Sequence, residues 1–210
     1  MFDHSIIGWP ADFEHVRGPT PRDSSGWRMR VGRGCGGSTR VYIGLVQFMG
    51  QVWFDFSERS VWEFYRFVRE VAAQGDAVSL DWRPLPAPGQ EPIASAYLSL
   101  AGPDDRGRFL HAALGLVHLE GADPADPSTL AAAAAASGLE VDASVDAAAL
   151  DRLRGDASAL GVVAVPTVYR HGPVVHVVLN AAATLGDVRT RARTIWAMVD
   201  DDGIWELSKP

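Results

Sequence analysis

The sequence predicts an α/β fold: a small mixed β-sheet flanked by helices, with an all-helical segment inserted into it. Three observations support this. Between residues 51 and 82, an alternating apolar pattern, an amphipathic helix pattern and a second alternating pattern follow one another. A helical pattern then fills about residues 91–160, and two β-branched segments and a last helix follow it. Two strands joined through a helix lie parallel and a hairpin is antiparallel, so the predicted sheet is mixed.

The first three elements follow from periodicity. Residues 51–56 alternate apolar and polar side chains and predict a strand. Residues 59–73 carry an apolar stripe and predict an amphipathic helix, with Ser57 as the expected N-cap. Residues 77–82 alternate again and predict a second strand.

The remaining elements are separated by glycine and proline. Four helices are predicted at residues 93–100, 108–119, 128–136 and 146–153. Two strands at 162–169 and 174–179 flank a turn and predict a hairpin. A final helix at 187–199 has one apolar face, and most tryptophans, Trp53, Trp82, Trp196 and Trp205 among them, are expected in the core.

Three segments make up the predicted domain organisation. Residues 1–48 form a flexible arm rich in Arg, Gly and Pro, or lie upstream of a misassigned translation start, because Met49 directly precedes the first clear strand. Residues 49–89 and 156–210 form the sheet domain, and residues 90–155 form the helical insertion. Gly32–Gly37 matches G-x-G-x-x-G but does not follow a strand, so we interpret the match as chance.

Composition limits the function. The chain has 210 residues with 19 Lys and Arg against 26 Asp and Glu, a net charge of −7, which argues against nucleic acid as a partner. The lack of a run of about 18 apolar residues argues against a membrane partner, and without a recognisable signal peptide we expect a cytoplasmic protein. The single Cys35 excludes an internal disulfide and a multi-cysteine zinc site, and we expect no metal.

Four segments carry a resemblance to a known family: Trp53–Phe56, Phe109–Gly115, Gly161–Thr167, and the ending from Ile195 to Leu207. In this order they resemble the DsbA family, whose thioredoxin fold has a helical insertion. The ending is similar to that of the mycothiol-dependent nitroreductase branch. The resemblance implies an oxidoreductase-like protein, a cis proline at Pro166 and an active-site groove between the start of the first helix and Val165–Pro166.

The sequence departs from that family at the catalytic centre. The family has a nucleophilic cysteine at the start of the first helix, where this chain has Ser57-Glu58-Arg59-Ser60. An alignment without gaps puts Glu58 at the cysteine position, and a one-residue gap puts Ser57 and Ser60 at the two cysteines of a C-x-x-C motif. Neither residue type supplies a thiolate, so thiol redox chemistry by the protein itself is not expected.

Two functional hypotheses follow from this departure. In the first, a non-redox protein binds a thiol, a peptide or a small aromatic ligand in the groove, with Arg59, Trp62, Val165, Pro166 and His111 as candidate binding residues. In the second, the chain resembles thiol-dependent isomerases: Ser57 or Ser60 contacts the sulfur of a thiol cofactor, and Glu58 moves a proton. A partner subunit that uses the fold only as an interaction surface is a third alternative.

For each candidate residue a structural role competes with the functional one. Glu58 could simply favour the helix dipole, Pro166 could only shape a turn, Trp62 could be core, and His111 and His118, seven residues apart on one helix face, could be packed or surface histidines. No tightly bound cofactor is expected. A low-molecular-weight thiol, mycothiol or glutathione, is the candidate small-molecule partner, and a homodimer stays open.

Overall fold

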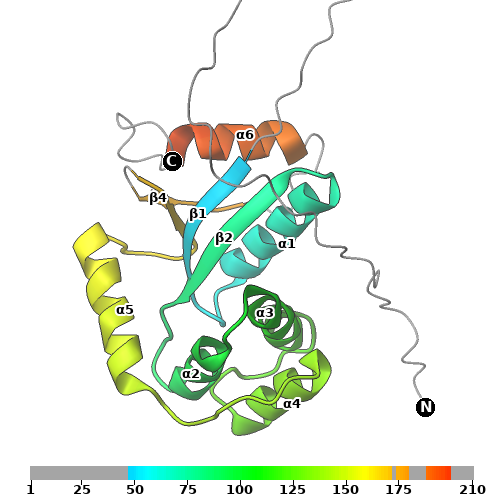
Figure 1. Cartoon of the computed structure of the whole chain (residues 1–210), viewed down its shortest axis with the longest axis vertical. Helices are drawn as coiled ribbons and strands as arrows, with labels where there is room; N and C mark the ends of the chain where they lie inside the picture. Colours follow the sequence, from blue (N-terminus) through cyan, green and yellow to red (C-terminus); the bar gives the residue numbers. More distant parts are fainter. Residues whose placement is uncertain (1–46, 172–173, 180–187, 200–210) are drawn as a thin grey trace, which may run out of the picture. The chain divides into compact units, whose positions relative to one another are not determined.

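The computed structural model describes residues 47–171, 174–179 and 188–199, all within the unit Ile43–Pro210. Figure 1 shows the elements in chain order: β1 (Gln47–Phe54), α1 (Arg59–Ala73), β2 (Ala77–Pro84), α2 (Glu91–Ser99), α3 (Pro103–Leu119), α4 (Pro127–Ser137), α5 (Ala147–Leu160), β3 (Thr167–Tyr169), β4 (Val175–His176) and α6 (Val188–Val199). The predicted N-terminal arm up to residue 46, including Cys35 and Gly32–Gly37, lies outside the described residues. So do residues 200–210, which include Trp205.

The four strands form one mixed sheet in the order β2-β1-β3-β4. β1 runs parallel to β2, with Val52 opposite Trp82, and antiparallel to β3, with Val52 opposite Val168. β3 and β4 are antiparallel, with Val168 opposite Val175. The predicted mixed sheet is therefore confirmed.

The helix α1 is buried on two sides, because its apolar residues recur at helical spacing over more than one face. One side packs against the sheet and α6 through Phe64, Phe67, Val68 and Val71. The other side packs against α2, α3 and α4 through Val61, Trp62 and Tyr65. The single helix thus joins both parts of the core, and its first turn lies where β1 ends.

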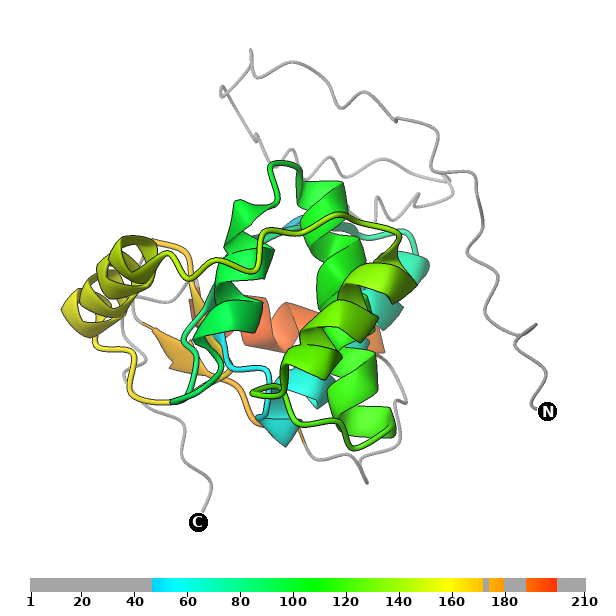
Figure 2. The same cartoon turned by 90° about the horizontal axis from the view of Figure 1, so that it is seen from below.

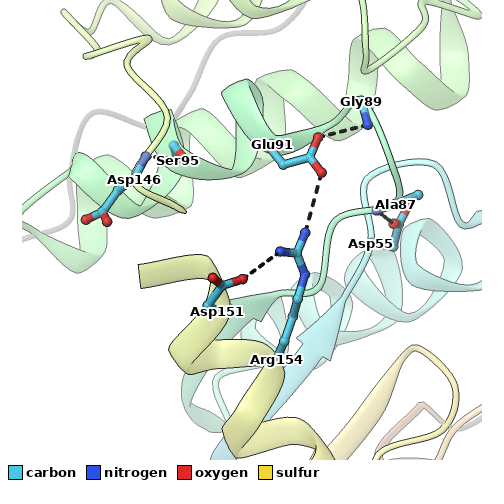
Figure 3. A network of polar contacts seen from close by, with 8 residues as sticks. All are labelled: Asp55, Ala87, Gly89, Glu91, Ser95, Asp146, Asp151 and Arg154. Carbon is cyan, nitrogen blue, oxygen red and sulfur yellow. Dashed lines mark hydrogen bonds and ion pairs between the residues drawn. The ribbon is translucent and has the colours of Figure 1, made fainter. Parts of the chain in front are cut away.

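The helices α2 to α5 lie between β2 and β3 in the chain, as the predicted insertion requires. α2, α3 and α4 lie beyond the carboxyl ends of β1 and β2 (Figure 1), and Figure 2 shows them from below. The helix α5 buries only Leu150 and Ala157. Polar contacts attach it to α2: Arg154 lies 3.4 Å from Glu91, and the Asp146 N–H donates to Ser95 Oγ at 3.1 Å (Figure 3).

Several predicted boundaries are wrong. β1 begins at Gln47 and ends at Phe54, and the insertion helices reach residue 160. Pairing with β2 sets the start of β1, which alternation alone missed because Gly50 interrupts it. In the predicted strand 162–169 only residues 167–169 pair, since Pro166 has no N–H for a ladder.

The connections define the fold class. A β-α-β unit with two parallel strands, followed by a helical insertion and then an antiparallel hairpin and a helix, is the thioredoxin-like arrangement. In this α/β fold the insertion lies between β2 and β3. The class predicted from the sequence is therefore confirmed.

Gly50 provides a test of the sheet. Its φ is 156°, and a Cβ atom built there would lie 2.7 Å from the carbonyl oxygen of Tyr169. We expect Gly50→Ala to lower the free energy of unfolding by about 1–3 kcal/mol from backbone strain alone, measured by urea denaturation. The matched variant Gly107→Ala, in α3 with open space around it, should instead stabilise by about 0.5–1 kcal/mol. Equal effects of the two variants would contradict the proposed close approach of β1 and β3.

Candidate functional site

The first turn of α1 carries most of the candidate residues. Glu58 is the N-cap, because its extended backbone (φ −74°, ψ 116°) precedes the helix and its carbonyl accepts from the Val61 N–H at 3.0 Å. Its side chain makes no capping hydrogen bond and is exposed. The predicted N-cap, Ser57, is therefore wrong by one residue. The reason is a local contact between Ser57 and Asp55.

Asp55 organises the entry into α1. Its carboxylate is buried, and Oδ1 accepts from both the Ser57 N–H (2.7 Å) and the Ser57 hydroxyl (2.5 Å). The other oxygen, Oδ2, accepts from the Ala87 N–H at 2.7 Å in the loop after β2 (Figure 3). This one carboxylate, directly after β1, orients the exposed Ser57. It also connects the start of α1 to the loop between β2 and α2.

A side-chain hydrogen bond brings the start of α1 to the loop before β3. The Ser60 hydroxyl donates to the carbonyl oxygen of Val165 at 3.2 Å, although 105 residues separate the two. The Val165–Pro166 peptide bond is cis, and the carbonyl of Pro166 accepts from the Val177 N–H at 2.9 Å. The two segments expected to line a groove therefore lie in contact.

Arg59 connects α1 to the end of α3. Its guanidinium donates to the carbonyl oxygen of His118 at 3.1 Å and pairs with Glu63 at 2.8 Å. The side chain is 60% exposed, so the ion pair itself adds little stability. Arg59 therefore presents an exposed positive charge beside Glu58 while contacting α3.

Trp62 and Tyr65 of α1 lie between the two histidines of α3. Trp62 stacks on His118 with ring centroids 6.0 Å apart, and on Tyr65 at 6.1 Å. His111 of α3 lies beside the next turn of α1, and its ring centroid is 5.9 Å from that of Tyr65. Trp62 is 5% exposed, so it packs in the core directly beneath the first turn. His118, which the candidate set left out, lies nearer the start of α1 than His111 does.

The two histidines make stability depend on pH. Burial lowers the pKa of His118 below its usual 6.5, with a further contribution from Arg59, and burial and then Arg69 lower the pKa of His111. The unfolded chain therefore takes up protons near pH 6.5, whereas the folded protein takes them up only at lower pH. In that window the unfolded state binds more protons, so stability falls as pH falls.

We expect the free energy of unfolding, measured by urea denaturation, to decrease from pH 7.5 to pH 5.5. His118→Gln removes one of the two titrating groups and should make the decrease smaller. His171→Gln, at an exposed position after β3, should leave it unchanged. A decrease of the same size in His118→Gln and the original protein would contradict this assignment.

The chemistry available at this site uses oxygen and nitrogen. Ser57, Glu58 and Ser60 supply hydroxyl and carboxylate groups where α1 begins, and the only cysteine, Cys35, lies outside the described residues. Within the described ranges, no three His, Cys, Asp or Glu side chains form a group that could hold a metal ion. The arrangement can bind through hydrogen bonds and charge, and Glu58 can accept or release a proton.

Sequence reasoning assigned no site role to Asp55, and it weighed His118 only together with His111, as a pair that could line a pocket. Asp55 had a usable signal, because an Asp two residues before a Ser favours a turn in which the carboxylate accepts from the backbone. The spacing of seven placed His118 on the same helix face as His111 but could not show which of the two lies beside the first turn of α1.

The fold class is thus thioredoxin-like with a helical insertion, and comparisons with solved structures add likenesses at low identity. The crystal structure of Salmonella enterica serovar Typhimurium DsbL is 13% identical, with 74% of this chain and 89% of that chain covered and a TM-score of 0.43. A structure of reduced DsbL is 14% identical, covering 74% and 91%, with a TM-score of 0.42. At these scores the fold class rests on the strand order and connections, not on the likeness.

Comparisons with protein-family models and with curated protein sequences find no match to this chain. Among the helices in the described parts of the chain, none combines the length and the apolar character needed to span a membrane.

Proposed function

We propose that this chain is a DsbA-like protein that binds a low-molecular-weight thiol, or a small ligand of similar chemistry, between Ser57–Trp62 and Val165–Pro166. It has no thiol redox chemistry of its own. The observation that carries the proposal is the hydrogen bond from Ser60 to Val165, which joins the start of α1 to the loop before β3. In the alignment with a one-residue gap, this hydroxyl stands where the DsbA family has the second cysteine of its C-x-x-C motif.

The surroundings of this contact support a small ligand with both polar and apolar parts. Exposed Glu58 and Arg59 offer both signs of charge. Two large apolar side chains next to the contacting residues are also exposed: Leu119 (69%), which follows His118, and Val163 (96%), two residues before Val165. The first N–H groups of a helix are additional donors, because they have no intrahelical acceptor.

Ligand-induced stabilisation tests the binding proposal. A ligand at a hundred times its Kd should raise the melting temperature by roughly 5–10 °C in a thermal-shift assay. The screen uses glutathione, mycothiol and nitroaromatic compounds. Ser60→Ala should reduce the shift, whereas Ser158→Ala, at an exposed position on α5, should keep it. The absence of a shift with every compound would overturn the proposal.

Activity assays test the non-redox part. We expect no catalytic reduction of insulin or of nitroaromatic compounds, because a serine or carboxylate cannot exchange disulfides. The decisive variant is Cys35→Ser, which removes the only thiol. Reduction that survives in Cys35→Ser would overturn the premise that thiol chemistry was lost with the cysteine.

A second candidate function is a thiol-dependent isomerase or transferase. The short hydrogen bond from Ser57 to buried Asp55 favours it, because it directs the hydroxyl proton toward the carboxylate and leaves the oxygen lone pairs available to accept from the S–H group of a bound thiol. Glu58, the next residue, could then move a proton. Turnover that survives Cys35→Ser but is lost in Ser57→Ala and Glu58→Gln would establish this function in place of simple binding.

A further inference from the structure

A buried hydrogen-bond acceptor near the start of α1 has no partner among the described residues: Nε2 of His118. Contacts of both the ring and the backbone hold His118 in place. The ring stacks on Trp62 at an interplanar angle of 20°, and it lies close to the backbone of Phe56. The backbone carbonyl of His118 itself accepts from Arg59. The ring position is thus fixed from both α1 and the segment that leads into it.

The chemistry of a neutral imidazole shows what the unpartnered Nε2 can do. In a neutral imidazole one nitrogen donates and the other accepts, so the tautomer with its proton on Nδ1 has a free lone pair on the unpartnered Nε2. The charged groups that face the ring are Arg59, Glu63 and Asp55. Burial and Arg59 favour the neutral ring, and they outweigh the two carboxylates, since the pKa of His118 is lowered.

Both serine hydroxyls at the start of α1 already donate their protons within the protein. The hydroxyl of Ser57 donates to Asp55, and that of Ser60 donates to Val165. A buried acceptor without a donor is unfavourable, so a ligand that supplies one gains affinity from it. A thiol near neutral pH carries its proton and is such a donor.

We propose that His118 is a positioning residue for the thiol ligand, with Nε2 accepting a hydrogen bond from the ligand's S–H group. This inference rests on the proposed function. No covalent bond forms or breaks, and the proton stays on the sulfur. Nε2 is shielded from solvent in this structure, so binding also requires a neighbouring side chain to move. His118 thereby sets where the sulfur lies relative to Ser57 and Ser60.

Three variants separate the acceptor from the ring. His118→Phe keeps an aromatic ring for Trp62 but has no acceptor, whereas the amide oxygen of His118→Gln can take the place of Nε2. We expect His118→Phe to weaken binding of glutathione or mycothiol about tenfold in isothermal titration calorimetry, and His118→Gln to stay within about threefold of the original protein. The control His171→Phe, at an exposed residue outside the site, should bind unchanged.

Methylation of the ligand sulfur completes the test, because it removes the S–H donor. The S-methyl form should bind the original protein about tenfold more weakly than the free thiol, and this difference should disappear in His118→Phe. If His118 had only a structural role, replacing it would weaken the binding of the free thiol and of the S-methyl form equally.

Equal affinity of His118→Phe and the original protein for the thiol would overturn the inference. An equally large effect of S-methylation on binding to His118→Phe and to the original protein would also overturn it. If the original protein binds neither thiol, the thiol-binding part of the proposed function fails together with this inference, and the first titration shows this before any variant is compared. A variant that does not fold is recognised by its far-UV circular dichroism. In that case His118→Gln provides the comparison: its amide oxygen can still accept from the S–H group, so S-methylation should weaken binding to His118→Gln as it does to the original protein.

Discussion

Phe54→Ala is expected to lower the free energy of unfolding by about 3–5 kcal/mol, because the lost ring leaves a cavity where both parts of the core meet. The Phe54 side chain is fully buried at the carboxyl end of β1. Its ring makes edge-on contacts with Phe56 at 5.1 Å, Tyr97 at 5.7 Å and Trp82 at 5.8 Å. Trp82 also packs against the cluster that includes α6, so the cavity would weaken the whole domain.

Equilibrium denaturation in urea, followed by tryptophan fluorescence and by far-UV circular dichroism, measures this effect. If Phe54→Ala does not fold, Phe54→Leu should still fold and lose about 1.5 kcal/mol or less. Val163→Ala is the control, since that exposed side chain should change stability by less than about 0.5 kcal/mol. A loss below about 1 kcal/mol in Phe54→Ala would mean that the aromatic contacts around β1 do not hold the core together.

Asp55→Ala is the second large effect, because it removes the acceptor of three hydrogen bonds at once. The backbone N–H groups of Ser57 and Ala87 would lose their partner in a partly buried position. Each such loss costs about 1–3 kcal/mol, so the total should exceed about 2 kcal/mol. Asp55→Asn keeps one acceptor oxygen and should lose less.

The same substitution should weaken ligand binding, because Ser57 and the entry into α1 lose their support. Thermal unfolding with and without glutathione or mycothiol measures both effects on one sample. Asp104→Asn, at an exposed position in the first turn of α3, is the matched control and should leave both quantities almost unchanged. If Asp55→Ala is as stable as this control, the carboxylate does not organise the loop.

The helices were the most predictable part of the fold. Residues 59–73 were predicted as a helix from their apolar stripe, and α1 has those bounds. The stripe repeats within each turn, so neighbouring residues already contain the information. β3 and β4 were predicted too long, because the length of a strand depends on the partner that hydrogen-bonds to it.

The candidate site was predictable as segments but not as contacts. Ser57, Glu58, Arg59 and Ser60 adjoin one another in the chain, so any helix that begins near residue 59 brings them together. No local pattern shows that Ser60 meets Val165, or that Arg59 meets His118. The family resemblance indicated the first of these neighbourhoods, and the second emerged only from the folded chain.

Periodicity and the spacing of Gly and Pro were therefore sufficient for the order of strands and helices and for the mixed sheet, and the family resemblance pointed to the oxygen-bearing side chains at the start of α1. Tertiary structure alone decided that Asp55 holds Ser57 and the loop after β2, that Trp62 is buried, and that His118 rather than His111 lies beside the first turn. The physical reason is the sequence separation of the residues that interact. Periodicity reflects interactions within a turn or two, whereas these contacts join residues tens of positions apart that meet only once the helices pack.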